Sequence, residues 1–337
     1  MIGEPILEVE GLDVVIPLLA GTLRPVRDLA FAVARGETFC IVGESGCGKS
    51  LTALALMNLL PRRARRSARR LRFAGTDLAR LDERRMADLR GDRIAMIFQE
   101  PMTALNPAYT IGNQLEEAML RHRRVSRAEA RDRAIFLLEK VGITAASSRL
   151  RQYPHQLSGG LRQRVMIAMA LMCGPELIIA DEPTTALDVT IQAQILHLLA
   201  ALQREFRMAV ILITHDLGIV ARVADRVAVM YAGQIVETGA VADIFARPMH
   251  PYTQGLLRCI PVPGRTRRGA HLGSIPGLVP SLMGELAGCG FRNRCVYASP
   301  PCAAGGIGLV PLSPQRAYRC LLPPRECAAN AAAAAAP

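Results

Sequence analysis

The sequence of 337 residues contains no tryptophan, and aromatic residues make up only 4% of it. Proteins that bind single-stranded nucleic acid stack the bases on aromatic side chains, so this scarcity argues against such a platform. The hydrophobic residues, 50% of the chain, are therefore mainly aliphatic and favour α/β packing. The length is sufficient for one large domain and a smaller one.

Membrane-targeting signals are also missing from the sequence. The N-terminus carries Glu4, Glu8 and Glu10 in place of a basic start and an apolar core, so we predict no cleavable signal peptide. No uninterrupted apolar stretch approaches the roughly 18 residues that cross a bilayer. We therefore expect a soluble, intracellular chain that reaches a membrane only through a partner.

The charge is strongly basic, at +12, and part of it lies in an arginine cluster at residues 62–70. Such a cluster attracts nucleic acid or an anionic membrane surface, but a solvated loop explains it equally well. The sequence resembles no helix-turn-helix, RNA-recognition motif or zinc finger, so we expect no nucleic-acid partner.

The central motif of the chain is GESGCGKS at Gly43–Ser50, which fits the phosphate-binding loop pattern G-x-x-x-x-G-K-[ST]. An apolar strand is predicted at 38–42 and a helix at 51–60, so backbone N–H groups and the helix dipole would face phosphates. The alternative is a flexible Gly/Ser turn. The residues predicted to bind the nucleotide are Gly43, Glu44, Ser45, Gly46, Cys47, Gly48, Lys49, Ser50 and Leu51.

Polar residues follow two further apolar runs. The run at 94–98 ends at Gln99, which is placed to touch Mg²⁺ or the attacking water, and Ser50 would take another Mg²⁺ position. The run at 177–182 ends with Asp181, which would hold Mg²⁺ through water, and Glu182, which would polarise the attacking water. Two solvated carboxylates are the alternative.

A second anion-binding helix start is predicted at Ser158, Gly159 and Gly160, ahead of an apolar helix at 165–172. One nucleotide does not need two such sites, so we expect this one to serve another subunit. Asp188 would cap a helix at 189–206. A strand at 209–213 leads to His215, which could contact the γ-phosphate, although a lone histidine is more often a core residue.

The part after Arg247 is rich in proline, glycine and cysteine and shows little periodicity. Cys289, Cys295, Cys302 and Cys320 follow the spacing C-x5-C-x6-C-x17-C, which in a cytosolic protein indicates a metal site before it indicates disulfides. The C-x2-C pairs usual for zinc are absent. Reduced structural thiols or zinc stay open as alternatives, and the alanine-rich end is predicted to be disordered.

Together these motifs resemble the ATP-binding-cassette (ABC) ATPases over about residues 6–245. Gly43–Ser50 is similar to Walker A, Gln99 to the Q-loop, residues 157–161 to the signature with Leu161 where Gln is usual, and residues 178–182 to Walker B. Residues 186–188 and His215 match the D-loop and the switch histidine. The resemblance implies an α/β P-loop NTPase core with an antiparallel β subdomain, a helical subdomain at about 100–170 and a small irregular extension.

We predict a nucleotide-binding domain at 1–246, a cysteine-bearing domain at 247–327 and a disordered tail at 328–337. The sequences at 98–107 and 250–253 are similar to those of the ABC ATPases that power dipeptide, oligopeptide and nickel importers. This implies ATP, Mg²⁺ and a [4Fe–4S] cluster on the four cysteines. The implied partners are a second homologous ATPase, two transmembrane permeases and an extracytoplasmic solute-binding protein, at the cytoplasmic side of the cell membrane.

Three alternatives accompany this interpretation. The solute could be nickel or another small molecule instead of a peptide. A soluble cassette ATPase of DNA repair or translation would usually carry two cassettes or a coiled-coil insertion, and a non-hydrolysing regulator would not need Glu182 and His215. The first aromatic residue is Phe31, so the adenine contact is left open between Arg24 and an aliphatic side chain.

Overall fold

The structure is a computed structural model that describes residues 4–184, 188–260 and 273–335. The chain forms two compact units. Unit 1 contains Met1–Leu7, Val33–Thr38 and Arg72–Ile213, whereas unit 2 contains Glu8–Ala32, Phe39–Leu71 and Thr214–Pro337. The domain boundaries predicted from the sequence do not coincide with the borders of these two units, and they stay a proposal.

Unit 1 is built on the parallel strands β7 (Ile94–Ile97), β8 (Leu177–Asp181) and β9 (Ala209–Thr214). Nearly all their residues are buried, as expected for continuous apolar strands of a parallel sheet. Ile97 pairs with Ala180, so β7 and β8 end at the same edge of the sheet. The strands predicted at 94–98, 177–182 and 209–213 are confirmed to within a residue.

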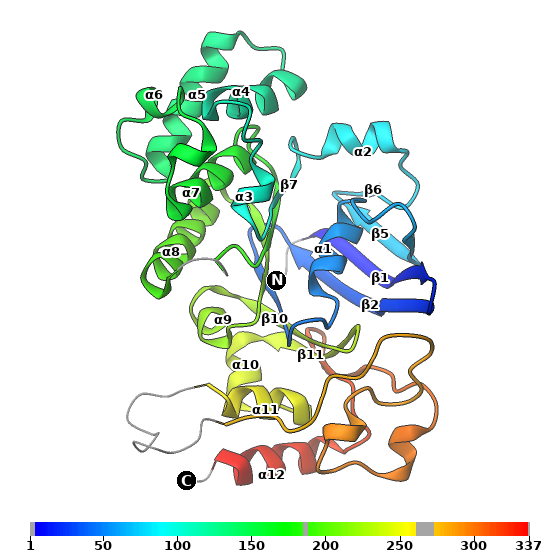
Figure 1. The fold of residues 1–337 in the computed structure, drawn as a ribbon. Helices are drawn as coiled ribbons and strands as arrows, with labels where there is room; N and C mark the ends of the chain where they lie inside the picture. The colour runs from blue at the N-terminus through cyan, green and yellow to red at the C-terminus, as the bar shows by residue number, and fades with distance from the viewer. Residues whose placement is uncertain (1–3, 185–187, 261–272, 336–337) are drawn as a thin grey trace. The chain divides into compact units, whose positions relative to one another are not determined.

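Most helices of unit 1 lie between β7 and β9 in the sequence. Figure 1 shows α4, α5 and α6 grouped together in space. The helical stretch predicted at 111–141 is two helices, because the chain leaves the helix at Arg123 and restarts with a capping box of Ser126 and Glu129. The elements are α2 (Glu83–Leu89), α3 (Pro101–Ala104), α4 (Ile111–His122), α5 (Arg127–Lys140), α6 (Ala146–Arg149), η1 (Pro154–Gln156), α7 (Gly159–Ala170) and α8 (Val189–Phe206).

Unit 2 contains the strand that precedes the phosphate-binding motif, β3 (Thr38–Val42), which pairs in parallel with β10 (Arg226–Tyr231). Antiparallel pairing then continues through β11 (Gln234–Ala240), β13 (Arg316–Tyr318) and β12 (Val310–Ser313). The C-terminal part therefore adds two strands to this sheet, although its sequence shows little strand periodicity.

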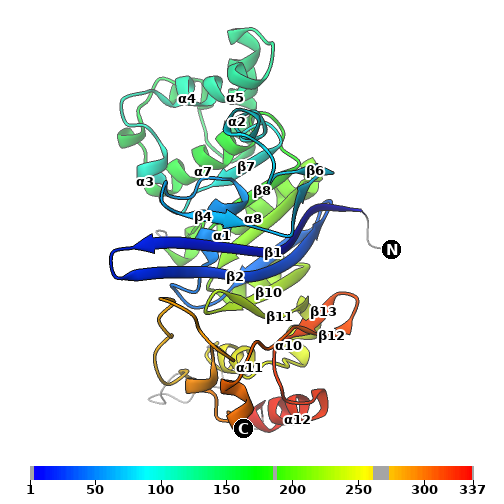
Figure 2. The same ribbon diagram turned by 90° about the vertical axis from the view of Figure 1, so that its right-hand side faces the viewer.

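Unit 2 also holds most of a long antiparallel hairpin, drawn in blue in Figure 2, made of β1 (Pro5–Leu18) and β2 (Gly21–Ala34). The strands predicted at 6–15 and 29–33 are shorter than these. Part of the arginine cluster is also ordered, because β4 (Arg65–Ser67) pairs with β1. Two short strands, β5 (Arg70–Phe73) and β6 (Thr76–Asp77), form a further antiparallel pair.

The alanine-rich end, predicted to be disordered from residue 328, is instead part of helix α12 (Pro324–Ala335). Alanine has the highest helix propensity, and the first turn is anchored by the fully buried Cys327, which packs with Met249 and Tyr318. The remaining elements of unit 2 are α1 (Lys49–Leu56), α9 (Leu217–Val223), α10 (Val241–Ala246), α11 (Pro251–Arg258), η2 (Arg292–Arg294) and η3 (Pro300–Ala303). Within the described ranges, no helix is long and apolar enough to cross a membrane.

Candidate nucleotide-binding and catalytic site

The phosphate-binding motif lies between β3 and α1, as predicted, and its glycines are required by close backbone contacts. A Cβ atom at Gly43 would collide with the carbonyl oxygen of Met230, and one at Gly48 would collide with that of Pro25. Gly48 also has φ 104°, a conformation that other residues rarely adopt, and it caps α1 without a side chain. A tight, glycine-dependent loop therefore leads into the helix N-terminus.

The loop closes around the Lys49 amine, because Lys49 is only 4% exposed and its Nζ donates hydrogen bonds to two loop carbonyls. The acceptors are the oxygens of Gly43 at 2.8 Å and of Glu44 at 3.0 Å. Ser45 and Gly46 are exposed, whereas Ser50 and Leu51 in the first turn of α1 are partly buried. The positive charge is thus held within the loop, where phosphates bind in proteins of this type.

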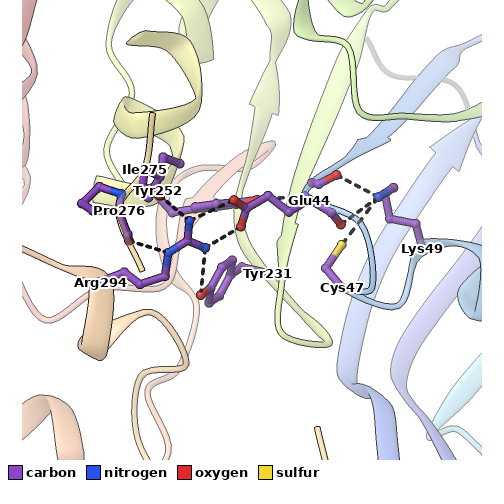
Figure 3. Close-up of polar contacts among 9 residues, drawn as sticks. Glu44, Cys47, Lys49, Tyr231, Tyr252, Ile275, Pro276 and Arg294 are labelled. Carbon is purple, nitrogen blue, oxygen red and sulfur yellow. Dashed lines mark hydrogen bonds and ion pairs between the residues drawn. The ribbon is translucent and has the colours of Figure 1, made fainter. Parts of the chain in front are cut away.

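The structure adds three residues to this site that sequence reasoning missed. The hydroxyl of Tyr252 accepts a hydrogen bond from the Glu44 N–H at 2.9 Å, and Arg294 forms an ion pair with the Glu44 carboxylate at 2.6 Å. Tyr231 lies beside Arg294, as Figure 3 shows. No local pattern could have identified Arg294, because it lies 250 positions from Glu44 in the chain.

The sheet of unit 1 brings together the predicted catalytic acids and the Q-loop residue. Asp181, which is 5% exposed, ends β8, and Gln99 follows the end of the neighbouring strand β7. Glu182 has φ 43°, an uncommon value for a residue with a side chain, and its N–H donates to the Ile213 carbonyl at 3.0 Å.

The two helix starts at Ser158 and Asp188 also lie in unit 1. The Ser158 hydroxyl caps α7 by accepting the Leu161 N–H at 3.4 Å, and Asp188 caps α8 by accepting the Ile191 N–H at 3.0 Å. Ser158 and Gly159 are exposed, and Gly160 faces the Ile191 side chain, so the two caps are near neighbours. The predicted cap at Asp188 is confirmed, whereas Ala186 and Leu187 of the predicted D-loop lie outside the described residues.

The switch histidine belongs to unit 2, together with the phosphate-binding loop. His215 is exposed just ahead of α9, and the next residue, Asp216, caps that helix by accepting the N–H groups of Gly218 at 2.7 Å and Ile219 at 3.3 Å. The predicted site residues are therefore divided between the two units. Arg24, considered for the adenine contact, forms an ion pair with Asp13 at 3.4 Å.

Cys289, Cys295, Cys302 and Cys320 all line one cavity of about 70 Å³ in the C-terminal part. A single water needs roughly 10–15 Å³, so this cavity is larger than one water requires. All nine cysteines are free thiols, and burial raises the pKa of Cys295 to about 11. Among the described residues, however, no three His, Cys, Asp or Glu side chains are arranged to hold a metal ion.

Cys327, which does not line the cavity, interacts with Cys320. A hydrogen bond between Cys320 and Cys327 lowers the pKa of Cys320 to about 7, and the Leu322 N–H also donates to the Cys320 sulfur at 3.5 Å. The remaining cysteines differ in burial. Cys40 and Cys47 are fully buried, as expected for small apolar residues, whereas Cys173 and Cys259 are only partly buried.

Fold and motifs define the class as a P-loop NTPase of the ABC type. Residues 26–185 match the family described as "ABC transporter", and residues 236–302 match "Oligopeptide/dipeptide transporter, C-terminal region". The chain is 54% identical over 293 residues to the dipeptide transport ATP-binding protein DppD of Bacillus subtilis (strain 168), covering 87% of both chains. It is 49% identical over 318 residues to DppD of Escherichia coli (strain K12), covering 94% and 97%.

Solved structures show the same architecture. The dimeric post-hydrolysis structure of the ATP-binding cassette MJ0796, bound to ADP and Pi, matches with a TM-score of 0.63 and 26% identity over 70% of this chain and 98% of that one. Clostridium perfringens cbiO1, part of the cbiONQ transporter complex, matches with a TM-score of 0.61 and 27% identity, covering 72% and 91%. The chain belongs to the ATP-binding subunits of ABC transporters, and the predicted fold class is confirmed.

Proposed function

We propose that this chain is the ATP-hydrolysing subunit of a binding-protein-dependent importer for di- and oligopeptides. The observation that carries the proposal is the combination of a complete phosphate-binding loop with a C-terminal region of the oligopeptide/dipeptide transporter type. Relatives of about 50% identity are named as dipeptide or peptide import proteins, which favours peptides over nickel.

ATP binding is assigned to the loop at Gly43–Ser50. Lys49 reaches the β- and γ-phosphates by exchanging its two carbonyl contacts for phosphate oxygens, which are stronger acceptors because they are charged. The N–H groups at the start of α1 add a favourable dipole. His215 contacts the γ-phosphate.

Hydrolysis is assigned to the ends of β7 and β8. Glu182 accepts a proton from the attacking water and orients it, because the reaction depends mainly on positioning and on charge neutralisation. Ser50, Gln99 and Asp181 are the residues that would hold Mg²⁺ through oxygen atoms, and the ion would supply positive charge against the phosphates. The buried position of Asp181 at a strand end supports this assignment.

The second helix start supports a dimer of ATPases. Ser158 and Gly160, with Asp188 beside them, complete the nucleotide site of another cassette, and a homologous partner subunit is proposed in place of a second copy. The exposure of Ser158 and Gly159 is compatible with this role. The matched cassette MJ0796 is described as dimeric.

The permease contact is assigned to a groove of about 720 Å³ in the helical part of unit 1. Tyr109, which is 54% exposed, lines it together with Glu116 and Glu117. Such an open, partly apolar groove suits a short helix of a membrane subunit. Through two permeases the chain would sit at the cytoplasmic side of the cell membrane, with a solute-binding protein outside.

The docking assignment is tested by charge reversal. Glu116→Lys with Glu117→Lys should abolish copurification of the permeases, whereas Glu139→Lys on the exposed part of α5, outside the groove, should leave it intact. Permeases that copurify equally with both variants would contradict the assignment.

A [4Fe–4S] cluster is proposed for the cysteine-lined cavity, because four thiolates can supply all its protein ligands. Among the described residues these thiols are not arranged to hold a metal, so the proposal requires them to rearrange when the cluster binds. When bound, such a cluster would cross-link the extension, in a structural or redox-sensing role. The donor chemistry supports the proposal, and three of the four cysteines lie within the matched C-terminal region.

The cluster is tested by iron and sulfide analysis of protein purified without oxygen. Cys302→Ser should lose the brown colour and destabilise the part after residue 247, while Cys173→Ser, outside the cavity, should keep both. Stoichiometric zinc without iron, or no metal in a folded extension, would overturn the cluster.

The function itself is tested by uptake in cells that lack this chain. Re-expression should restore the uptake of labelled dipeptides and not of nickel, and Lys49→Ala should restore neither. Restored nickel uptake without peptide uptake would move the assignment to the nickel branch.

A further inference from the structure

The ion pair between Arg294 and Glu44 joins the C-terminal extension to the phosphate-binding loop within unit 2. The guanidinium contacts both carboxylate oxygens, at 2.6 Å and 3.0 Å, which is the bidentate geometry of a strong pair. The Arg294 side chain is 4% exposed and that of Glu44 is 28% exposed. The pair is therefore shielded from solvent much more than a surface salt bridge.

Arg294 is also held in place by its other contacts. Its remaining N–H groups donate to the carbonyl oxygens of Ile275 at 2.9 Å and Pro276 at 3.0 Å, and to the hydroxyl of Tyr231 at 3.3 Å. An arginine has five N–H donors, and all of them are used here. Figure 3 shows how these contacts aim the guanidinium at Glu44.

Glu44 is in turn restrained through each of its polar groups. Its N–H donates to Tyr252 at 2.9 Å, its carbonyl accepts from Lys49 at 3.0 Å, and its carboxylate accepts from Arg294. Tyr252 is fully buried in α11, with its ring centroid 4.5 Å from that of Tyr231. The second residue of the loop is therefore positioned by residues of the C-terminal part.

The charge of Glu44 makes this arrangement consequential. A carboxylate on a phosphate-binding loop repels the triphosphate, and the repulsion is stronger in a partly buried site than in water. Arg294 neutralises that carboxylate, so the charge of Lys49 stays available to the phosphates. Losing Arg294 would leave an unpaired carboxylate on the second residue of the loop.

We propose that Arg294 and Tyr252 are positioning residues for the nucleotide site, through which the C-terminal extension sets the shape and charge of the phosphate-binding loop. The inference rests on the proposed ATP site at Gly43–Ser50. It gives the extension a direct part in ATP binding, separate from any group held by its cysteines.

The experiment measures the Kd of AMP-PNP with Mg²⁺ for the purified full-length chain. Arg294→Gln should weaken binding roughly tenfold, since a shielded charge is left unpaired. Glu44→Gln combined with Arg294→Gln should bring the Kd back to within about threefold of wild type, because the repulsive carboxylate is then gone. Arg292→Gln is the matched control. It replaces an arginine of the same turn that donates to the Cys289 carbonyl oxygen instead of to Glu44, so the Kd should be unchanged.

Three results would overturn the proposal: wild-type affinity in Arg294→Gln, no recovery in the double variant, or equal weakening in Arg292→Gln. The recovery also separates positioning from misfolding, since a second substitution would not repair a merely unfolded extension. Lys49→Ala separates a failure of the proposed ATP site from a failure of the positioning role of Arg294. If Lys49→Ala binds AMP-PNP normally, the proposed ATP site is wrong. If Lys49→Ala loses binding while Arg294→Gln keeps it, only the role of Arg294 fails.

Discussion

Two helix starts in this chain have the same predicted chemistry but differ in what surrounds them. At α1 the cap is Gly48, without a side-chain hydrogen bond, and Lys49 is buried with its amine against two loop carbonyls. At α7 the cap is Ser158, whose hydroxyl accepts a hydrogen bond from the Leu161 N–H. Ser158 and Gly159 are both exposed. Both present the positive end of a helix dipole.

Because both helices have this dipole, we expect the groups around each helix start to decide whether it binds a nucleotide without a second chain. The start of α1 has its own cation and a loop held by Tyr252 and Arg294. The start of α7 offers N–H groups and a hydroxyl, which suit a phosphate whose other contacts come from a second chain. One site is thus proposed to bind ATP alone, and the other to act only in a dimer.

The largest expected effect tests whether the two helix starts meet in an ATP-bound dimer. Glu182→Gln removes the group proposed to polarise the attacking water, so hydrolysis by the assembled transporter should fall by about 10²–10⁴, while ATP binding is retained. The trapped nucleotide should make the dimer stable in size-exclusion chromatography. Glu205→Gln, on the exposed face of α8, serves as the control, and near wild-type turnover in Glu182→Gln would remove the catalytic assignment.

The next effect separates the two starts by binding. Lys49→Ala should weaken the affinity of the isolated chain for ATP by roughly 10–100-fold, because it removes a charge-assisted contact. Ser158→Ala should leave that affinity unchanged. Equilibrium binding of a fluorescent ATP analogue measures both, and a loss of binding in Ser158→Ala would mean that the two starts are not functionally different.

A smaller effect is expected for Ser158→Ala in the assembled transporter. Turnover should fall roughly tenfold, since one hydrogen bond to a charged group is lost. The measurement is ATPase activity against subunit concentration. Full activity in a strictly monomeric preparation would contradict a shared site.

The smallest effect concerns the start of α11, where the neutral Nδ1 of His250 accepts the Tyr252 N–H at 3.0 Å. Burial, aided by the charge of Arg319, lowers the pKa of His250 from 6.5 to about 3. The unfolded chain therefore binds this proton first as the pH falls below 6.5, and stability declines by up to about 1.4 kcal/mol per pH unit. Above pH 6.5 this contribution to stability is fully present.

His250→Asn keeps a good cap but cannot titrate in this range. Urea unfolding at pH 7, 6 and 5 should show a shallower loss of stability for the variant than for wild type. Parallel curves would mean that His250 is not the titrating group. Because the cap positions Tyr252, the same comparison reports on how the extension supports the phosphate-binding loop.

The buried strands and the chemistry at their ends can be read from the residue order alone. Continuous apolar runs predicted β3, β7, β8 and β9, because a strand buried on both faces leaves a pattern that can be read locally. The same holds for the loop at Gly43–Ser50, where residue order alone prescribes glycine, lysine and hydroxyl. The alanine-rich end has low complexity, which predicts disorder, whereas the high helix propensity of alanine favours the helix that is observed.

The contacts of the C-terminal part, in contrast, could be found only in the folded chain. Its strands β12 and β13 form because β11 offers an edge for pairing, four of its cysteines meet around one cavity, and Arg294 reaches Glu44. Each of these depends on hydrogen bonds or side-chain contacts between residues far apart in the chain. Such contacts leave no periodic signal in the sequence, since their partners are chosen by the folded backbone.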